Sequence, residues 1–381
     1  MGANNSKRSV VVVGGGGAGS NIAGYLSTKL DPAQHSLMLI NARPFHVFLP
    51  ATVRMTVTTD GKLEEQILIP FDRVMSKGIG EFKVGRVVGI EKDERGGGSV
   101  LLEGGENVWY DVLVLAPGTM YEGPIEYPDT MEATLRQIEA WRKKVLHANT
   151  IVLSGGGPVN IELSGEIKYY YPEKKVTIVQ SGYLPLNRIY PDYFRERVAE
   201  AITSRGVEFI FNDYLDQDAA QDGFVTTRKG QKIPADLVMS SHGGRPNTDF
   251  IKTLGPDAVT SRGLVPVTPS LELCGHPGIF CAGDVLDNSE RNTLGKYEGH
   301  ANVIVANVLK WLKGEPSDSK YEGTLEAIGI TMGKTGGVTY LGDGTVEGDE
   351  FTRKYQAEKL LVPYGRGKMG YGQTDLTDTT E

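Results

Sequence analysis

The sequence is poor in cysteine. It contains 2 cysteines among 381 residues, Cys274 and Cys281. Two cysteines cannot form a disulfide scaffold or a four-cysteine zinc site. Their spacing also matches neither a C-x-x-C nor a C-x₄-C redox pair, so we expect no dithiol chemistry, and we predict no metal site.

An excess of positive charge is also missing. Lys plus Arg is 40 and Asp plus Glu is 48, which gives a formal net charge of −8. Proteins that bind nucleic acid usually present a basic face, so nucleic acid is not an expected partner. No run approaches 18 consecutive apolar residues, and no apolar h-region of a signal peptide is seen near the start. We therefore expect neither a transmembrane helix nor a secretory signal.

The remaining composition is that of a globular protein. Hydrophobic residues make up 39% and charged residues 23% of the chain, enough for a sizeable core. The length suggests two or three domains. Glycine is in excess, with 49 residues gathered in short clusters rather than in a collagen-like period.

A strand, a glycine loop, a helix and a second strand follow one another near the start. The apolar run 9–13 leads into a glycine-rich loop, and Ile22, Leu26 and Leu30 repeat every four residues as on one helical face. The apolar segment 37–40 then predicts the second strand. In this context the pattern G-x-G-x-x-G indicates a dinucleotide site.

The glycines of this loop have distinct predicted roles. Gly14 allows the tight turn, Gly16 lets the backbone approach a pyrophosphate, and Gly19 lets helix and strand pack closely. Gly15 and Gly17 complete the loop. The N-terminus of the following helix would face the phosphates.

The same pattern returns at residue 151. The apolar run 151–153 leads into a second loop that contains Gly155 and Gly157, followed by a helical segment 163–171 and a strand 176–179. Each half then continues as a predicted β-meander and closes on a strand that ends in glycine, at Gly118 and Gly243. One glycine motif is a weak signal, whereas two with the same flanking elements are a strong one.

A third element lies near residue 280. The apolar segment 278–282 ends in Gly283-Asp284 and is followed by a helical pattern from about Tyr297 to Lys313. An aspartate at such a strand end can accept hydrogen bonds from a polyol such as ribityl. Taken alone, it can equally cap a loop.

Together these elements resemble the two-dinucleotide-binding-domain flavoproteins, and within that family the apoptosis-inducing-factor-like and ferroptosis-suppressor-like group. The resemblance runs from residue 9 to about 340. The matching segments are 14–19, Phe45-His46 with Arg54, 87–91, 116–118, 162–168, 171–177, 282–284 and 300–307.

The resemblance implies an α/β fold with two Rossmann-like domains arranged as in glutathione reductase. An NAD(P)H-binding domain, residues 121–245, is inserted in an FAD-binding domain formed by residues 1–120 and 246–315. Residues 316–381 would form a small C-terminal α+β region. Beyond about residue 350 the match fades, and the Gly- and Thr-rich residues 365–381 predict a mobile tail.

The activity implied is that of an FAD-dependent NAD(P)H:quinone oxidoreductase. Hydride would pass from NADH or NADPH, as co-substrate, to flavin N5 and then to a quinone or another small-molecule acceptor. Two alternatives stay open. One is an FAD enzyme that acts on another small molecule and has a degenerate NAD(P)H site. The other is a non-enzymatic flavoprotein of the apoptosis-inducing-factor type.

The resemblance also assigns site residues. Arg54 would contact the flavin, with a structural arginine as the alternative. Glu162 would lie near the nicotinamide, and Lys296 would stabilise the reduced flavin at a helix N-terminus; either could instead be a surface charge. The predicted cofactor-binding residues are Gly14, Gly15, Gly16, Gly17, Gly19, Asn41, Arg54, Val87, Ala116, Gly118, Asp284, Gly155, Gly157 and Gly243.

Four residues depart from the family pattern. Asn41 stands where a carboxylate usually binds the adenosine ribose, so its amide would bind a hydroxyl without charge assistance. Asn160 replaces the third glycine of the second loop, and the steric argument predicts weaker nucleotide binding. Gln180 and Ser181 follow the next strand instead of a carboxylate, so NADPH is not excluded.

The first six residues fit a lipidation pattern. They match M-G-x-x-x-[ST], the signal for N-myristoylation at Gly2, and Lys7 and Arg8 follow. A chance match is the alternative. One acyl chain holds a membrane only marginally, and a basic pair would help. The predicted location is cytoplasmic, with association to a membrane surface or lipid droplet through the lipid at Gly2.

Overall fold

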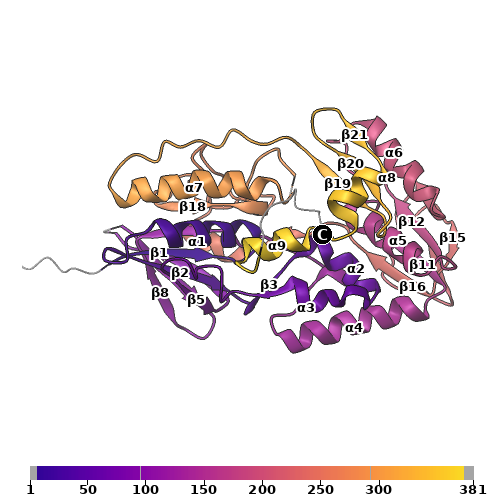
Figure 1. The fold of residues 1–381 in the computed structure, drawn as a ribbon, viewed down its shortest axis with the longest axis horizontal. Helices are drawn as coiled ribbons and strands as arrows, with labels where there is room; N and C mark the ends of the chain where they lie inside the picture. The colour runs from indigo at the N-terminus through magenta and orange to yellow at the C-terminus, as the bar shows by residue number, and fades with distance from the viewer. Residues whose placement is uncertain (1–6, 95, 292, 373–381) are drawn as a thin grey trace, which may run out of the picture.

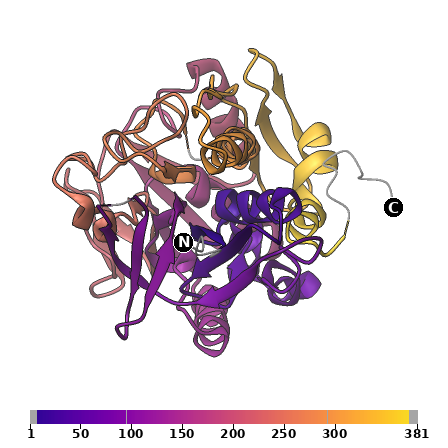
Figure 2. The ribbon, with the colours of Figure 1, turned by 90° about the vertical axis from the view of Figure 1, so that its left-hand side faces the viewer.

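The computed structural model describes residues 7–94, 96–291 and 293–372. Two α/β units lie side by side along the long axis, with the first residues in one unit and the middle of the chain in the other (Figure 1). A smaller region from the end of the chain packs against both (Figure 2). The predicted fold class is confirmed by this architecture.

The first unit is built on a five-stranded parallel sheet with the order β18-β9-β1-β2-β5. The core of its central strand is buried, since Val10, Val11 and Val12 have no exposed surface. Such continuous apolar runs are typical of parallel strands covered on both faces. The strands are β1 Arg8–Val13, β2 His35–Asn41, β5 Glu81–Val84, β9 Val112–Leu115 and β18 Ile279–Cys281.

Two helices from distant parts of the chain lie side by side on one face of this sheet (Figure 1). They are α1, Gly17–Lys29, and α7, Lys296–Leu312, so the chain returns to the first unit after residue 245. A three-stranded antiparallel meander lies beside the sheet. It consists of β6 Val87–Lys92, β7 Gly98–Leu102 and β8 Asn107–Tyr110.

The second unit repeats the arrangement on a four-stranded parallel sheet with the order β13-β12-β11-β16. The strands are β11 Thr150–Ser154, β12 Lys175–Gln180, β13 Val207–Phe211 and β16 Leu237–Ser240. Its other elements are the helices α4 Met131–His147, α5 Pro158–Tyr170 and α6 Asp192–Thr203, and the hairpin of β14 Phe224–Thr226 with β15 Lys232–Pro234.

Two short strands mark where the chain passes between the units. β10, Thr119–Met120, pairs antiparallel with β17, Arg245–Pro246, with Thr119 opposite Pro246. The shorter elements of the first unit are β3 Phe45–Val47, η1 Leu49–Ala51, α2 Thr52–Val57, η2 Asp60–Lys62, α3 Leu63–Ile67, β4 Leu68–Pro70, η3 Gly123–Ile125, η4 Asp249–Leu254 and η5 Gly283–Val285.

The C-terminal region contacts both units. Its sheet packs Ile330, Met332 and Val338 into the core of the second unit, whereas Leu360 and Val362 join the core of the first. The elements are β19 Ile328–Thr331, β20 Gly337–Tyr340, β21 Val346–Glu347, α8 Asp349–Thr352, the π-helix η6 Arg353–Ala357 and α9 Val362–Lys368.

The helix α9 differs from the sequence prediction. A mobile tail was predicted from residue 365, but α9 continues to Lys368, and Gly365 and Gly367 are buried. A Cβ at Gly365 would lie 2.5 Å from the ring of Phe48, so the small residue allows close packing on the first unit. The glycines that suggested mobility are packing residues here.

Candidate functional site

A cavity of about 850 Å³ opens at the carboxyl ends of the first sheet's strands. This edge of a parallel sheet is where open α/β folds bind ligands, and the volume lies at the upper end of the range of about 300–1,000 Å³ for small-molecule sites. Predicted site residues that line it are Gly14, Gly15, Gly16, Gly17, Asn41, Val87, Ala116, Gly118 and Asp284.

Close backbone packing explains two glycines of the first loop. Gly14 has a φ of +102°, and a Cβ there would lie 2.1 Å from the carbonyl oxygen of Ala116. A Cβ on Gly19, which lies behind the cavity lining, would lie 1.8 Å from the carbonyl oxygen of Gly14. Neither contact is tolerable, so any side chain at Gly14 or Gly19 would force the loop apart.

Gly16 has the opposite surroundings. A Cβ at this position would meet no atom within 4 Å, and the residue lines the cavity at the start of α1. No side chain caps α1, so its first N–H groups are free to bind an anion. The loop therefore provides a cradle of the kind that holds a pyrophosphate.

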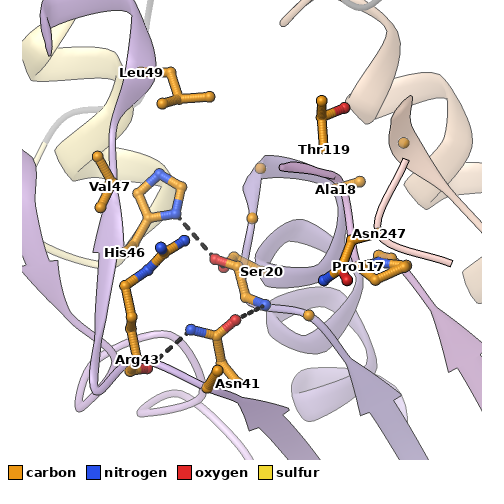
Figure 3. Close-up of a pocket in the computed structure, with 18 of the residues that line it drawn as sticks. Ala18, Ser20, Asn41, Arg43, His46, Val47, Leu49, Pro117, Thr119 and Asn247 are labelled. Atoms are coloured by element: carbon orange, nitrogen blue, oxygen red, sulfur yellow. Dashed lines mark hydrogen bonds between the residues drawn. The ribbon is translucent and has the colours of Figure 1, made fainter. Parts of the chain in front are cut away.

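Asn41 braces this loop from the end of β2. Its Oδ1 accepts a hydrogen bond from the N–H of Gly15 at 2.9 Å, and its Nδ2 donates to the carbonyl oxygen of Arg43 at 2.8 Å. Figure 3 shows the amide between these two backbone groups. The predicted contact of Asn41 with a ribose hydroxyl stays a prediction, but its bracing role is visible in the structure.

Arg43 is a cavity residue that the sequence analysis missed. Its Nη1 donates to the carbonyl oxygen of Tyr127 at 2.8 Å, while its Nε is buried without a partner among the described residues. Burial lowers the pKa of the guanidinium. Figure 3 shows the side chain extending toward His46 and Ser20. A half-buried cation with a free donor suits an anionic ligand, and the signal was an arginine two residues after a strand end.

His46 contributes a neutral ring to the same wall. Its Nδ1 lies 2.9 Å from the carbonyl oxygen of Gly15, which only accepts, so Nδ1 carries the proton. Burial lowers the pKa of His46 to about 4. The imidazole therefore positions the glycine loop and adds no charge at neutral pH.

Asp284 lines the cavity beside the start of α1, since a Cβ on its neighbour Gly283 would lie 3.4 Å from the Cβ of Ala18. It accepts hydrogen bonds from Thr119 Oγ1 at 3.0 Å and from Tyr297 Oη at 2.7 Å. Burial raises the pKa of its carboxyl group. Tyr297 also covers the start of α1, since a Cβ at Gly17 would lie 2.6 Å from its ring. Tyr297 is a site residue that the sequence pattern places only at the start of a helix.

Lys296 lies away from the cavity, contrary to what the resemblance implies. Its side chain is buried, and Nζ forms an ion pair with Glu326 at 2.8 Å. Successive residues of a helix point about 100° apart, so only one of Lys296 and Tyr297 can face the cavity. The structure turns Tyr297 toward it.

Arg54 also lies outside the cavity lining. Its Nε and Nη2 each donate to the carboxylate of Glu166 at 2.9 Å, and Nη2 and Nη1 donate to the carbonyl oxygens of Ala357 and Glu358. The side chains of Arg54 and Glu166 are 3% and 0% exposed. The guanidinium thus joins the first unit, the second unit and the C-terminal region, and Arg54 is not among the residues that line the cavity.

Glu162 lies on α5, one turn before Glu166. Its Oε1 accepts from the backbone N–H of Thr331 at 3.1 Å and from the hydroxyl of Thr331 at 3.0 Å. Burial raises the pKa of Glu162 to about 7 despite these two hydrogen bonds, with a contribution from the nearby charge of Glu166. The carboxyl group can therefore hold a proton near neutral pH.

The second glycine loop repeats the bracing of the first. Gly155 has a φ of +99°, and the N–H of Gly156 donates to Gln180 Oε1 at 3.0 Å, as Gly15 does to Asn41. Gly157 begins α5 without a side-chain cap, and a Cβ there would meet nothing within 4 Å. Gly155, Gly157 and Gly243, which has a φ of +90°, lie outside the cavity of the first unit.

Asn160 is built into this loop. Its Nδ2 donates to the carbonyl oxygens of Ser154 and Gly155, both at 2.8 Å, and the residue is fully buried. Its Oδ1 has no partner among the described residues. The steric argument from the sequence treated this side chain as an obstacle, but in the structure the amide connects the helix to the loop.

The lipidation site predicted at Gly2 lies outside the described residues. Within the described part of the chain, none of the helices combines the length and the apolar character needed to cross a bilayer. The two cysteines differ in surroundings, since Cys274 is exposed and Cys281 is buried on β18.

Comparisons with known proteins agree with this geometry. The sequence profile described as pyridine nucleotide-disulphide oxidoreductase matches residues 8–306. The FAD-dependent oxidoreductase FVFD30 of Flammulina velutipes is 39% identical over 319 residues, 83% of this chain and 99% of that protein. Ferroptosis suppressor protein 1 of Mus musculus is 27% identical over 290 residues, 74% of this chain and 76% of that protein.

A solved structure resembles the whole chain. The sulfide:quinone oxidoreductase of Aquifex aeolicus superposes with a TM-score of 0.75 at 19% sequence identity. The match covers 96% of this chain and 92% of that one. At this level of identity, the likeness shows the fold.

Proposed function

The chain belongs to the pyridine nucleotide-disulphide oxidoreductase family, and we propose that it is an FAD-dependent NAD(P)H:quinone oxidoreductase. It is an FAD-dependent oxidoreductase with NAD(P)H as its co-substrate. The quinone acceptor is the part of the proposal that goes beyond the family. The observation that carries the proposal is the pairing of two braced glycine loops, one of which opens into a cavity of dinucleotide size.

The residues present fit FAD in the first unit. The uncapped start of α1, the open position at Gly16 and the free donor of Arg43 favour a pyrophosphate. Asp284, which also lines the cavity, can accept further hydrogen bonds from a polyol. When bound, FAD supplies the redox chemistry, taking a hydride from NAD(P)H and passing electrons to the acceptor.

The chain's own residues position and polarise this site. The start of α7, at Leu294 and Tyr297, lines the cavity without a side-chain cap, so its positive dipole end favours negative charge there. Lys296 adds no net charge to the cavity, because its Nζ is held in a buried ion pair with Glu326. We propose that Glu162, whose pKa is raised to about 7, contacts the nicotinamide side and holds a proton there.

The acceptor proposal rests on what surrounds the cavity. Neither Cys274 nor Cys281 lines it, so electrons would not leave through a dithiol pair in the described part of the chain. One wall is apolar and aromatic and suits a quinone ring. It is formed by Phe48, Leu49, Pro50, Tyr364 and Met369. The fold is also that of a sulfide:quinone oxidoreductase.

Anaerobic flavin reduction tests the proposal. The FAD-loaded protein is mixed with NADH or NADPH, and bleaching of the flavin absorbance is followed by stopped flow. A water-soluble quinone is then added without oxygen. We expect bleaching by the nucleotide and recovery of the absorbance on addition of quinone. Bleaching without recovery would contradict the quinone acceptor, and no bleaching would contradict the use of NAD(P)H.

Asn160 favours a second candidate function, an FAD enzyme that acts on another small molecule. This residue fills the position of the third glycine in the second loop and carries a partnerless buried Oδ1. If this substitution prevents nucleotide binding, the flavin would have to receive its electrons from another small molecule. The absence of bleaching by either nucleotide would favour this candidate.

We also propose membrane attachment through myristate at Gly2. The support is the match of residues 1–6 to the acylation pattern and the basic pair at Lys7 and Arg8. Gly2→Ala should move the protein to the soluble fraction in cells and leave the reduction of a water-soluble quinone unchanged, because lipidation changes location and not the active site. Equal membrane recovery of variant and parent would contradict it.

A further inference from the structure

The carboxyl end of β12 decides which pyridine nucleotide the second glycine loop can accept. In dinucleotide-binding folds this strand end lies beside the adenosine ribose. A carboxylate there binds the ribose hydroxyls of NADH, whereas an arginine nearby accommodates the 2′-phosphate of NADPH. The charges around β12 therefore carry information about the co-substrate.

The strand end itself is neutral. Gln180 uses its Oε1 to accept from the N–H of Gly156 at 3.0 Å and its Nε2 to donate to the carbonyl oxygen of Leu184 at 3.1 Å. Ser181, the next residue, is exposed and carries a hydroxyl. Neither residue would repel a phosphate, and the serine hydroxyl can donate to one.

The segment 181–190 is fixed against the glycine loop. The N–H of Leu186 donates to the carbonyl oxygen of Gly156 at 2.8 Å. From α6, the buried Arg195 donates to the carbonyl oxygens of Pro185 at 2.9 Å and Leu184 at 3.3 Å. A charge on this segment is therefore held near the second nucleotide loop and not on a free surface loop.

Arg188 carries such a charge. The residue is exposed, and its guanidinium carbon lies 5.6 Å from the ring centre of Tyr183. A carboxylate lies beside the same tyrosine. Asp192 accepts hydrogen bonds from Tyr183 Oη and Arg195 Nη1, both at 2.6 Å. These hydrogen bonds hold the pKa of Asp192 below its ordinary value, with Arg188 contributing through space.

The three charged side chains around Tyr183, which are Arg188, Asp192 and Arg195, leave one net positive charge. Arg195 and Asp192 neutralise one another at close range, and Arg188 forms no ion pair with any residue that the structure describes. An arginine over an aromatic ring keeps its planar donors free for a phosphate. The surface formed by Ser181, Tyr183 and Arg188 thus has the chemistry of a phosphomonoester site.

We propose that this surface binds the 2′-phosphate of NADPH and that the protein prefers NADPH to NADH. Arg188 supplies the charge and Ser181 a hydroxyl donor. The inference rests on the proposed function, because it requires the nucleotide to bind at the second glycine loop. It adds the identity of the co-substrate and the residue that selects it.

Binding of nucleotide fragments to the FAD-loaded protein tests the inference without catalysis. Calorimetry with 2′,5′-ADP and with 5′-AMP, which differ by the 2′-phosphate, measures the contribution of that phosphate to the affinity. We expect the parent to bind 2′,5′-ADP about tenfold or more tightly than 5′-AMP, as for a charge-assisted contact. Arg188→Ala should remove this difference and leave the affinity for 5′-AMP unchanged.

Two further variants sharpen the test. Ser181→Asp places a carboxylate at the exposed strand end and should weaken the binding of 2′,5′-ADP more than that of 5′-AMP. The matched control is Arg197→Ala on α6, since Arg197 is an exposed arginine that pairs with Glu200 at 3.5 Å and should leave both affinities unchanged. Equal binding of the two fragments by the parent would overturn the inference, as would an undiminished preference in Arg188→Ala.

Flavin reduction separates this inference from the proposed function. Equal bleaching by NADH and NADPH would leave the proposed function standing and overturn the NADPH preference. Bleaching by neither would overturn the proposed function, and the inference would fall with it. Both would be supported if the parent has a lower KM for NADPH than for NADH and if Arg188→Ala raises the KM for NADPH but not that for NADH.

Discussion

Arg54 and Glu166 form a buried ion pair through two parallel hydrogen bonds of 2.9 Å, and the pair joins the two α/β units. Arg54 comes from α2 of the first unit and Glu166 from α5 of the second. The carbonyl oxygens of Ala357 and Glu358 accept two further hydrogen bonds from the guanidinium, so the C-terminal region is held at the same point.

Arg54→Ala should strongly destabilise the protein. The change leaves the carboxylate of Glu166 buried without its cation, which typically costs about 3–5 kcal/mol. Chemical denaturation followed by circular dichroism would measure the loss. The control is Arg136→Ala, which breaks an exposed pair with Glu132 and should cost less than about 1 kcal/mol. A loss for Arg54→Ala no larger than for the control would contradict this role.

Glu162→Gln should change how stability depends on pH. The folded protein holds the Glu162 proton up to about pH 7, while the ordinary pKa is 4.5, so the folded state binds more protons in this window. Stability contributed by Glu162 is therefore full below pH 4.5 and is lost as pH rises through 7.

The glutamine variant lacks this loss. At pH 8 it should be more stable than the parent by about 1–3 kcal/mol, and the two should converge toward pH 4. Free energies of unfolding measured from pH 4 to 8 would show this. Glu132→Gln, at an exposed position, is the control and should follow the parent at every pH. A Glu162→Gln variant that also follows the parent would contradict a raised pKa.

Asn160→Gly should destabilise the second unit. The change removes two hydrogen bonds from Nδ2 to the carbonyl oxygens of Ser154 and Gly155 and leaves a void in a buried position. Lost hydrogen bonds and a helical glycine each cost about 1 kcal/mol, so a loss of about 2–3 kcal/mol is expected. Urea denaturation would measure this loss. Unchanged or increased stability would contradict the stabilising role of Asn160 and favour the steric argument.

The sequence was sufficient for the two glycine loops because their requirements are local. Gly19 meets the carbonyl oxygen of Gly14 within a single strand–loop–helix turn, and the positive φ of Gly14 belongs to the same turn, so the spacing of the motif encodes both requirements. The same local rule located both helices that follow. The residues that brace the loops, Asn41 and Gln180, also stand where the pattern places the strand ends.

Contacts between distant segments could not be predicted in the same way. Arg54 meets Glu166 at a separation of 112 residues and Ala357 at 303, and no local pattern records either contact. The choice between Lys296 and Tyr297 depends on the rotation of α7 about its axis, which packing on α1 decides. Glycines near residue 365 suggested mobility because the ring of Phe48 that needs them lies far away in the sequence.

The paired variants Gly16→Val and Gly157→Val test the central claim that the two loops bind different nucleotides. Both glycines have extended backbones, with φ of −70° and −77°, and a Cβ at either meets no protein atom within 4 Å. Both variants should therefore fold, and each added side chain should obstruct only the ligand of its own loop.

Flavin content and anaerobic flavin reduction, measured on both purified variants, decide the matter. The account predicts that Gly16→Val loses bound FAD while keeping the parent's circular dichroism spectrum. It predicts that Gly157→Val keeps full FAD, with a flavin that dithionite still bleaches but NADPH reduces at least about tenfold more slowly, as expected when a contact of about 1.4 kcal/mol or more is lost. A Gly16→Val variant with full FAD, or a Gly157→Val variant reduced by NADPH as fast as the parent, would contradict it.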